Sequence, residues 1–117
     1  MVVIEGLAFG VRNATSLAQL SGLNYMIRTY LWENNLKFLI VAPTSLKKFI
    51  TTHGNAKKEE MMMEVFNKYH VGFPDDNVND AFCLAVVGRT LMNGSASSLN
   101  EKEVIDKLKK QQYDTRK

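Results

Sequence analysis

The chain has little of what would mark a secreted or membrane protein. Its 117 residues include one cysteine, Cys83, so no disulfide can form within the chain. A lone cysteine in an apolar helix fits a small core residue in a reducing compartment. No apolar run reaches the roughly 18 residues of a membrane-spanning helix, and no basic-then-apolar leader opens the sequence. We therefore expect a cytoplasmic protein with no membrane partner.

The composition is that of one ordinary globular domain. The apolar share is 45%, the net charge is +3 and the pI is about 9.0. A mildly basic balance permits binding to nucleic acid without demonstrating it.

The spacing of apolar residues predicts an α/β fold. Residues 2–5 and 38–41 are short apolar runs typical of buried strands. Between them, apolar side chains recur at three- and four-residue steps and predict a helix over Thr15–Asn34, whose apolar stripe should cover the sheet. Such a strand–helix–strand unit is expected to be parallel. Further helices are predicted from Pro43, over 57–69, over 78–92 and, after a flexible break at 94–98, to about Lys110, with Asn100 and Glu103 as a capping pair.

The segment Asp75–Ala85 places polar oxygens just before an apolar helical run. Asn77 and Asp80 are three residues apart and share a helix face, which Ala81 and Leu84 continue and which we expect to be buried. A carboxylate at a buried rim is costly unless a cation meets it, and a divalent metal is one candidate.

A second carboxylate, Glu5, ends the first predicted strand. Facing Asp80, it would give the geometry of metal-dependent nucleases, in which two ions hold the attacking water and the leaving oxygen of a phosphodiester. Two plainer interpretations stay open: Glu5 as a solvated strand-end charge, and Asp80 as a charge matched to its helix dipole.

Four motifs occur together in this order: Val3–Glu5 with Asn13–Leu17, Ala42–Phe49, Gly54–Lys58 and Asp80–Ala85. Their order and spacing resemble the second half of the RuvC-type Holliday-junction resolvases, including phage versions, from about residue 2 to residue 90. The resemblance implies part of a ribonuclease-H-like fold in residues 1–93, with a small parallel sheet and flanking helices. Residues 94–117 would form a break and a helical tail.

The resemblance also implies a site. The family binds two Mg²⁺ or Mn²⁺ ions in an acidic cluster. Glu5 matches its strand glutamate, and Asp80 matches the second acid of its last core helix. Asn77 stands in the place of the first acid, and Asp76, one residue earlier, is the alternative ligand.

The same resemblance implies contacts to DNA. Lys47 and Lys58 match lysines that lie beside the acids and contact phosphate, so Lys58 joins Glu5, Asp80 and Asn77 as a candidate catalytic residue. Lys57 clusters with these lysines, and Phe9 is a candidate for stacking on an unpaired base.

One departure matters for activity. The first strands of the family, with their aspartate, precede the position of Glu5, and nothing in this chain matches them. We therefore expect either an N-terminally truncated form or a protein whose missing part lies in another chain. In both cases the exposed strand edge should promote self-association or strand exchange.

The leading hypothesis is a Mg²⁺-dependent endonuclease that resolves four-way or branched DNA, incomplete in this chain, so that enzymatic activity is left open. The alternative is a catalytically silent DNA-binding or assembly module on the same fold. Either would act as a homodimer, in a bacterium or a phage-infected cell, with no small-molecule substrate.

Overall fold

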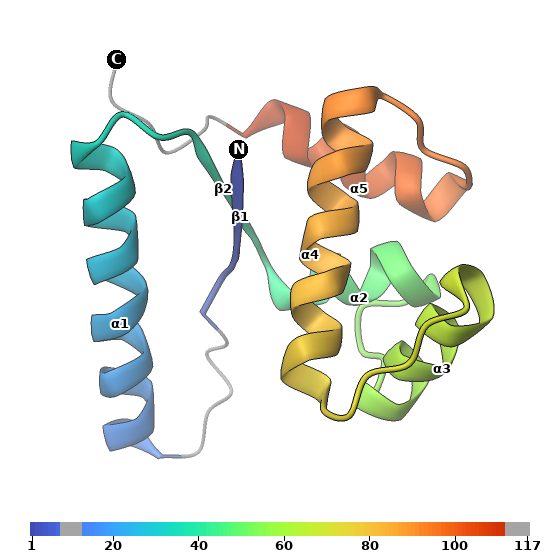
Figure 1. The fold of residues 1–117 in the computed structure, drawn as a ribbon, viewed down its shortest axis with the longest axis horizontal. Coiled ribbons are helices and arrows are strands. Elements are labelled where there is room, and N and C mark those ends of the chain that lie inside the picture. The colour runs from blue at the N-terminus through green and yellow to red at the C-terminus, as the bar shows by residue number, and fades with distance from the viewer. Residues whose placement is uncertain (8–12, 112–117) are drawn as a thin grey trace.

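The computed structural model describes residues 1–7 and 13–111, which form two strands and five helices (Figure 1). The elements follow one another as β1 (Val2–Glu5), α1 (Ala14–Glu33), β2 (Phe38–Val41), α2 (Pro43–Thr51), α3 (Lys58–Tyr69), α4 (Asp76–Asn93) and α5 (Leu99–Lys110). Phe9 lies outside the described residues. Among the described helices, none is both long enough and apolar enough to cross a membrane.

The two strands form a parallel pair in which Val2 is level with Phe38 and Glu5 with Val41. This pairing confirms the predicted strand–helix–strand unit. Figure 1 places α1 on one side of the strands and α2 to α5 on the other. The carboxyl ends of both strands therefore meet at the same end of the sheet, close to the start of α2.

The core lies between the sheet and helices α2 to α5. Its most deeply buried side chains come from β2, α2, α3, α4 and α5, for example Val41, Phe49, Val65, Val87 and Leu108. Helix α5 therefore belongs to the same core as the residues before position 94, although a flexible break was predicted between them. The division of the chain at residue 93 stays a prediction.

The predicted burial of the α1 stripe is wrong. Leu31 is the one buried residue of α1, whereas Leu20, Leu23 and Ile27 are 52%, 57% and 41% exposed. The physical reason is width: neighbouring strands lie about 5 Å apart, so a sheet of two strands offers too narrow a surface to cover a helix of five turns.

The predicted buried face of α4 is also wrong. Ala81 is exposed and Leu84 is half-buried, while the buried face contains Asn79, Cys83 and Val87. These three residues turn toward the core, because α4 packs against α2, α3 and α5 as well as against β1. The face that carries Asp80 consequently stays accessible.

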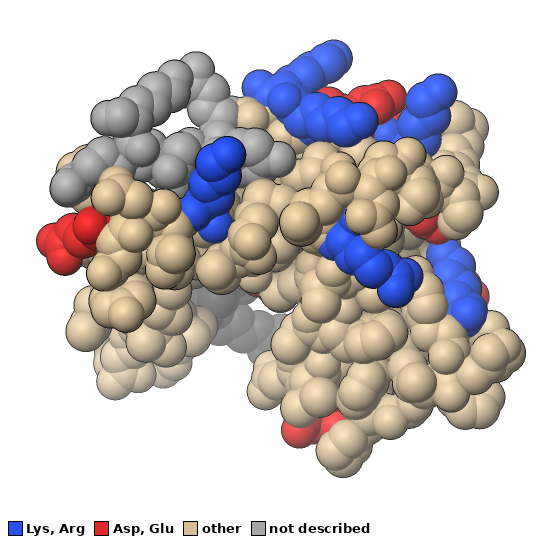
Figure 2. Space-filling model, turned by 45° about the horizontal axis from the view of Figure 1, so that its top comes forward, with Lys and Arg blue, Asp and Glu red and all other residues tan. Residues whose placement is uncertain are grey.

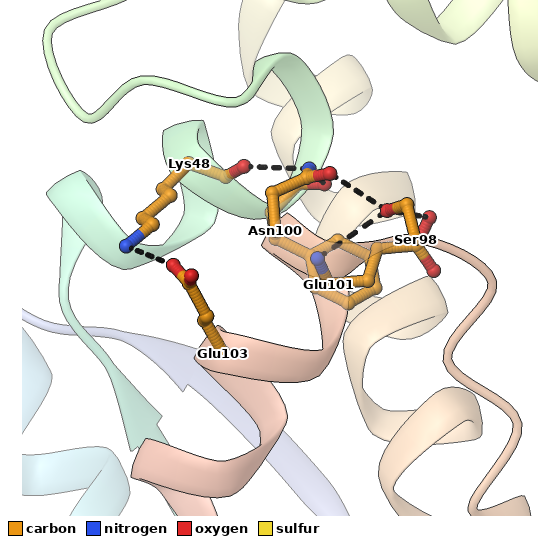
Figure 3. Close-up of polar contacts among 6 residues, drawn as sticks. Lys48, Ser98, Asn100, Glu101 and Glu103 are labelled. Carbon is orange, nitrogen blue, oxygen red and sulfur yellow. Dashed lines mark hydrogen bonds and ion pairs between the residues drawn. The ribbon is translucent and has the colours of Figure 1, made fainter.

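The predicted capping pair of α5 is wrong as well, and both of its members contact α2 instead (Figure 3). Ser98 is the N-cap and accepts a hydrogen bond from the backbone N–H of Glu101. The Asn100 amide donates to the carbonyls of Lys48 and Phe49 at 3.0 and 2.9 Å, and Glu103 pairs with Lys48 at 2.7 Å. Sequence spacing alone could not separate these alternatives, because serine and asparagine both favour N-caps.

Gly88 sets how closely α4 approaches β1, because a Cβ added there would lie 2.8 Å from Val3 Cγ2. We expect Gly88→Ala to lower the free energy of unfolding by about 1–3 kcal/mol, the usual cost of overpacking. In urea unfolding, Val3→Ala should recover part of this decrease.

The matched control is Gly22→Ala in α1, where an added Cβ meets nothing within 4 Å. This change should stabilise the protein by about 0.5–1 kcal/mol through helix propensity. Equal stability of the two alanine variants would contradict the close approach of α4 to β1.

Candidate functional site

The carboxyl end of the parallel sheet is where the predicted site residues meet. Glu5 ends β1 level with Val41, the last residue of β2. Ala42 alone separates β2 from α2, whose first residue is Pro43. Lys47 follows Pro43 by four residues and shares its helix face, so it is carried to the same end of the sheet as Glu5. Clefts outside the carboxyl ends of strands are the usual ligand sites of α/β sheets.

Helix α4 supplies the second carboxylate from the opposite direction. Its start is fixed by Asp75, whose side chain accepts a hydrogen bond of 2.9 Å from the backbone N–H of Val78. Asp76 and Asp80 then lie four residues apart, on one helix face. Asp76, Asn77 and Asp80 therefore all belong to the first turns of α4, which begins two residues before the predicted helix over 78–92.

Two clefts share Glu5 and Asp80. The first, here called the basic cleft, has a volume of about 580 Å³ and is lined by Glu5, Pro43, Lys47, Asn55, Ala56, Lys57, Lys58, Glu59, Met61, Asp76 and Asp80. All three predicted DNA-binding lysines thus lie in the same cleft as the two predicted carboxylates. Asp76 belongs to this cleft as well.

The second cleft, here called the leucine cleft, opens between α1 and α4. Its volume is about 350 Å³ and its lining residues are Glu5, Gly6, Leu7, Leu17, Leu20, Leu23, Asn24, Ile27, Asn77 and Asp80. Figure 2 shows the molecule hollowed between the part formed by α1, on the left, and the larger part on the right. Asn77 therefore lies on the leucine-cleft side of Asp80, and Asp76 on the basic side.

The two carboxylates are destabilised in their charged forms. Burial, and then repulsion from Asp80, raises the pKa of Glu5 above its ordinary value. Burial, and then repulsion from Asp76, raises the pKa of Asp80. Lys47, which lines the same cleft as both carboxylates, opposes both increases. Two repelling carboxylates beside one lysine favour the arrival of a further cation.

Two asparagines near the site were not predicted. The Asn24 amide of α1 donates a hydrogen bond of 3.3 Å to the Glu5 carbonyl, and Arg28 Nε donates to Asn24 Oδ1 at 2.6 Å. Asn55, in the turn before α3, lines the basic cleft. The sequence carries no signal for these roles, because a lone asparagine in a helix or turn fits many positions equally well.

The donor set fits a hard cation in part. Carboxylate and amide oxygens are the ligands that Mg²⁺ prefers, and Mg²⁺ often uses one or two protein carboxylates together with water and substrate phosphate. Glu5 and Asp80 meet that need. Within residues 1–7 and 13–111, however, no group of three or more His, Cys, Asp or Glu side chains is placed to hold a metal. The described residues thus provide two carboxylates, fewer than the acidic cluster implied by the resemblance.

Basic side chains also occur away from the clefts. Figure 2 shows Lys and Arg gathered along the upper edge of the molecule, where α5 lies, and the last turn of α5 contains Lys107, Lys109 and Lys110. Lys48, next to Lys47, is engaged by Glu103. Lys47, which lines the basic cleft, is therefore not part of this second group of basic side chains.

Comparison with solved structures finds the RuvC structure of Thermus thermophilus, with a TM-score of 0.55 and 21% sequence identity. The match covers 84% of this chain and 60% of that chain, so this chain spans less than two thirds of the length of RuvC. The likeness establishes a RuvC-like fold, consistent with part of an α/β ribonuclease-H-like domain. No family model and no curated protein sequence matches the chain.

The raised pKa values of Glu5 and Asp80 predict how stability depends on pH. The folded state holds these protons at pH values where the unfolded chain has released them, so stability should fall as pH rises through the raised values. Without divalent metal, Asp80→Asn should therefore stabilise the protein at neutral pH and flatten this dependence. Urea unfolding in EDTA at several pH values measures both effects.

The control for this change is Asp106→Asn, on the exposed side of α5. It should leave the pH dependence as it is in the unmodified protein. A decrease in stability on Asp80→Asn at neutral pH would mean that the carboxylate has a stabilising partner.

Proposed function

We propose that this chain belongs to a metal-dependent system that binds and cleaves branched DNA, such as four-way junctions. The observation that carries the proposal is the basic cleft, in which Glu5 and Asp80 lie with Lys47, Lys57 and Lys58 at the carboxyl end of a RuvC-like sheet. Carboxylates that repel each other beside a row of lysines are suited to an anionic substrate together with a cation.

The charges of the basic cleft support a role for a cation. Its lining contains three lysines and four acids, Glu5, Glu59, Asp76 and Asp80, so the acids exceed the lysines by one negative charge. A phosphate backbone would be repelled by that excess. One divalent cation changes the sum to +1, so metal binding and DNA binding should support each other.

Glu5 and Asp80 would hold the Mg²⁺ or Mn²⁺ ion. Asp76 shares the basic cleft with both carboxylates and would act on the ion through its charge or a bridging water, whereas Asn77 lines the leucine cleft. The ion would supply charge neutralisation and an activated water for phosphodiester hydrolysis. Lys47 and Lys58 would attract and orient the phosphate, and Asn24 would hold the end of β1 that carries Glu5.

A second candidate function is a DNA-binding module without catalysis. The observation that favours it is that the described residues bring two carboxylates together rather than the larger acidic cluster of a two-metal nuclease. Such a module would use the same lysines and would bind junctions without cutting them. The DNA substrate is common to both candidates, and cleavage separates them.

A homodimer is proposed for either candidate. Helix α1 carries exposed large apolar side chains over several turns, including Leu23, Met26 and Tyr30, which are 57%, 73% and 62% exposed. An apolar helix face of this length is typical of a surface that a partner covers.

The nuclease proposal is tested by incubating labelled four-way junctions and matched linear duplexes with the protein in Mg²⁺, Mn²⁺ or EDTA. We expect preferential binding of the junction and nicking that requires metal. Asp80→Asn should reduce nicking to background because it removes a metal ligand. The same variant should bind DNA in EDTA at least as tightly as the unmodified protein, because the cleft then carries one negative charge fewer.

Three results decide between the candidates. Junction binding without nicking in either metal supports the silent module. Nicking that survives in Asp80→Asn contradicts the assignment of Asp80 as a metal ligand. If nicking is lost, Asp106→Asn serves as the control for inactivation during preparation. Equal affinity for junction and duplex contradicts a role on branched DNA.

The lysines are tested by the salt dependence of junction binding. Removing one lysine–phosphate interaction should reduce the slope of log K against log salt by about 0.9. We expect Lys47→Ala and Lys58→Ala each to weaken binding and to lower the slope by about that amount. Lys37→Ala is the matched control, because Lys37 precedes β2 at the end opposite the cleft. Unchanged slopes for both cleft variants would place the DNA elsewhere.

A further inference from the structure

A small groove lies between α2 and α5, and we call it the α2–α5 groove. Its volume is about 160 Å³, and its walls include Thr44, Ser45 and Lys48 of α2 and Glu103 and Lys107 of α5. This space is several times the roughly 30 Å³ that one water molecule occupies in the liquid. A group of the size of a phosphate therefore fits in it.

The α2–α5 groove adjoins the basic cleft. The first turn of α2 lines both, with Pro43 in the basic cleft and Thr44 in the groove. The turn that follows α2 also lines both, with Asn55 in the basic cleft and Gly54 in the groove. These two segments are in close contact, because a Cβ added at Gly54 would lie 3.2 Å from the Thr44 carbonyl oxygen. The two hollows therefore lie side by side along one backbone contact.

Ser45 places a hydroxyl without a protein partner in the groove. The residue is 7% exposed, and its hydroxyl forms no hydrogen bond with another described residue. No fully buried side-chain oxygen or nitrogen within residues 1–7 and 13–111 lacks a partner, so the exposed part of Ser45 includes this hydroxyl. Because Ser45 lines the groove, the hydroxyl opens into it. A polar group that is nearly buried and unpaired in the protein is suited to a bound ligand.

The charges of the groove favour an anion. Lys48 of α2 pairs with Glu103 of α5 at 2.7 Å (Figure 3). Lys107 lies one turn after Glu103, and within the described part of the chain it forms no ion pair. The lining thus has one positive charge in excess, whereas the acids exceed the lysines in the basic cleft. An anion in the groove consequently requires no metal ion.

The start of α2 adds to this attraction. Its N-cap, Ala42, provides no side-chain hydrogen bond, and Pro43 has no backbone N–H. Thr44 and Ser45 belong to the first turn, where the helix offers its N–H groups no acceptor of its own. The positive end of the helix dipole therefore lies beside the groove and stabilises negative charge there.

We propose that the α2–α5 groove binds a phosphate group of a nucleic-acid strand whose neighbouring phosphate lies in the basic cleft. The Ser45 and Thr44 hydroxyls donate hydrogen bonds to the phosphate, and Lys107 supplies the opposite charge. The phosphate chemistry rests on the groove alone. The choice of a nucleic-acid strand as its source rests on the proposed function, because two adjoining hollows suit successive phosphates of one backbone.

A titration of the full chain with inorganic phosphate tests the groove, with amide shifts followed by NMR at constant ionic strength and chloride as the reference anion. We expect saturable shifts at Thr44, Ser45 and Gly54. Ser45→Ala and Lys107→Ala should each weaken phosphate binding at least about threefold, the effect of one modest hydrogen bond or more.

Two further variants separate the groove from general surface charge. Lys109→Ala removes a lysine of the same helix that does not line the groove, and it should leave phosphate binding unchanged. Glu103→Gln removes the one negative charge of the groove and releases Lys48, so phosphate binding should become tighter.

Junction DNA distinguishes a strand phosphate from free phosphate. Under the conditions used for Lys47→Ala, Lys107→Ala should lower the slope of log K against log salt by about 0.9, because one phosphate contact is lost. Lys109→Ala should leave the slope as it is in the unmodified protein. Inorganic phosphate should weaken DNA binding by the unmodified protein more than by Lys107→Ala, since both ligands compete for the groove.

Each outcome bears on one part of the inference. Without saturable shifts at Ser45 and Gly54, or with equal phosphate affinity in Lys107→Ala and Lys109→Ala, the groove is no phosphate site. Phosphate binding with an unchanged DNA slope in Lys107→Ala overturns the nucleic-acid strand as the source. A lower slope in Lys47→Ala alone leaves the proposed function standing while this inference fails. A lower slope in Lys107→Ala without metal-dependent nicking supports the groove and contradicts the nuclease.

Discussion

The parallel pairing of β1 with β2 is the interaction on which the rest of the structure depends. It sets Glu5 level with Val41, one residue before the chain turns into α2. A shift of one residue in this register would turn Glu5 to the opposite face of the sheet, away from Asp80. Gly88 strengthens the arrangement, because the lack of a side chain lets α4 lie close against Val3. These contacts hold the two carboxylates at one end of the sheet, where both clefts lie.

The elements of the fold could be predicted from the sequence, and the surroundings of each element could not. Short apolar runs and helical spacing identified the strands and helices, and Pro43 marked the start of α2. Periodicity gives the apolar face of a helix but not whether a neighbour exists to cover it, so the exposure of Leu23 was missed. The cap of α5 was missed for a related reason, since Asn100 is bound by carbonyls about fifty positions away in the sequence.

For the candidate site, the sequence allowed the charged residues to be predicted. Glu5 and Asp80 lie at the ends of recognisable elements, and the order of motifs related them to the lysines that share their cleft. The amides around them were not predictable, because the contact of Asn24 with Glu5 depends on the path of α1 across the sheet. The separation of Asp76 from Asn77 into different clefts depends on the rotation of α4, which sequence patterns determine only to within a neighbouring position.

The single-residue connection at Ala42 ties the orientation of α2 to the sheet. Each residue added to a helix rotates the next side chain by about 100° around the axis, since a turn contains 3.6 residues. A deletion or insertion at this joint would leave both strands and the core composition intact while rotating Lys47 out of the cleft. The one-residue length of this joint thus helps to direct Lys47 toward the two carboxylates at the end of the sheet.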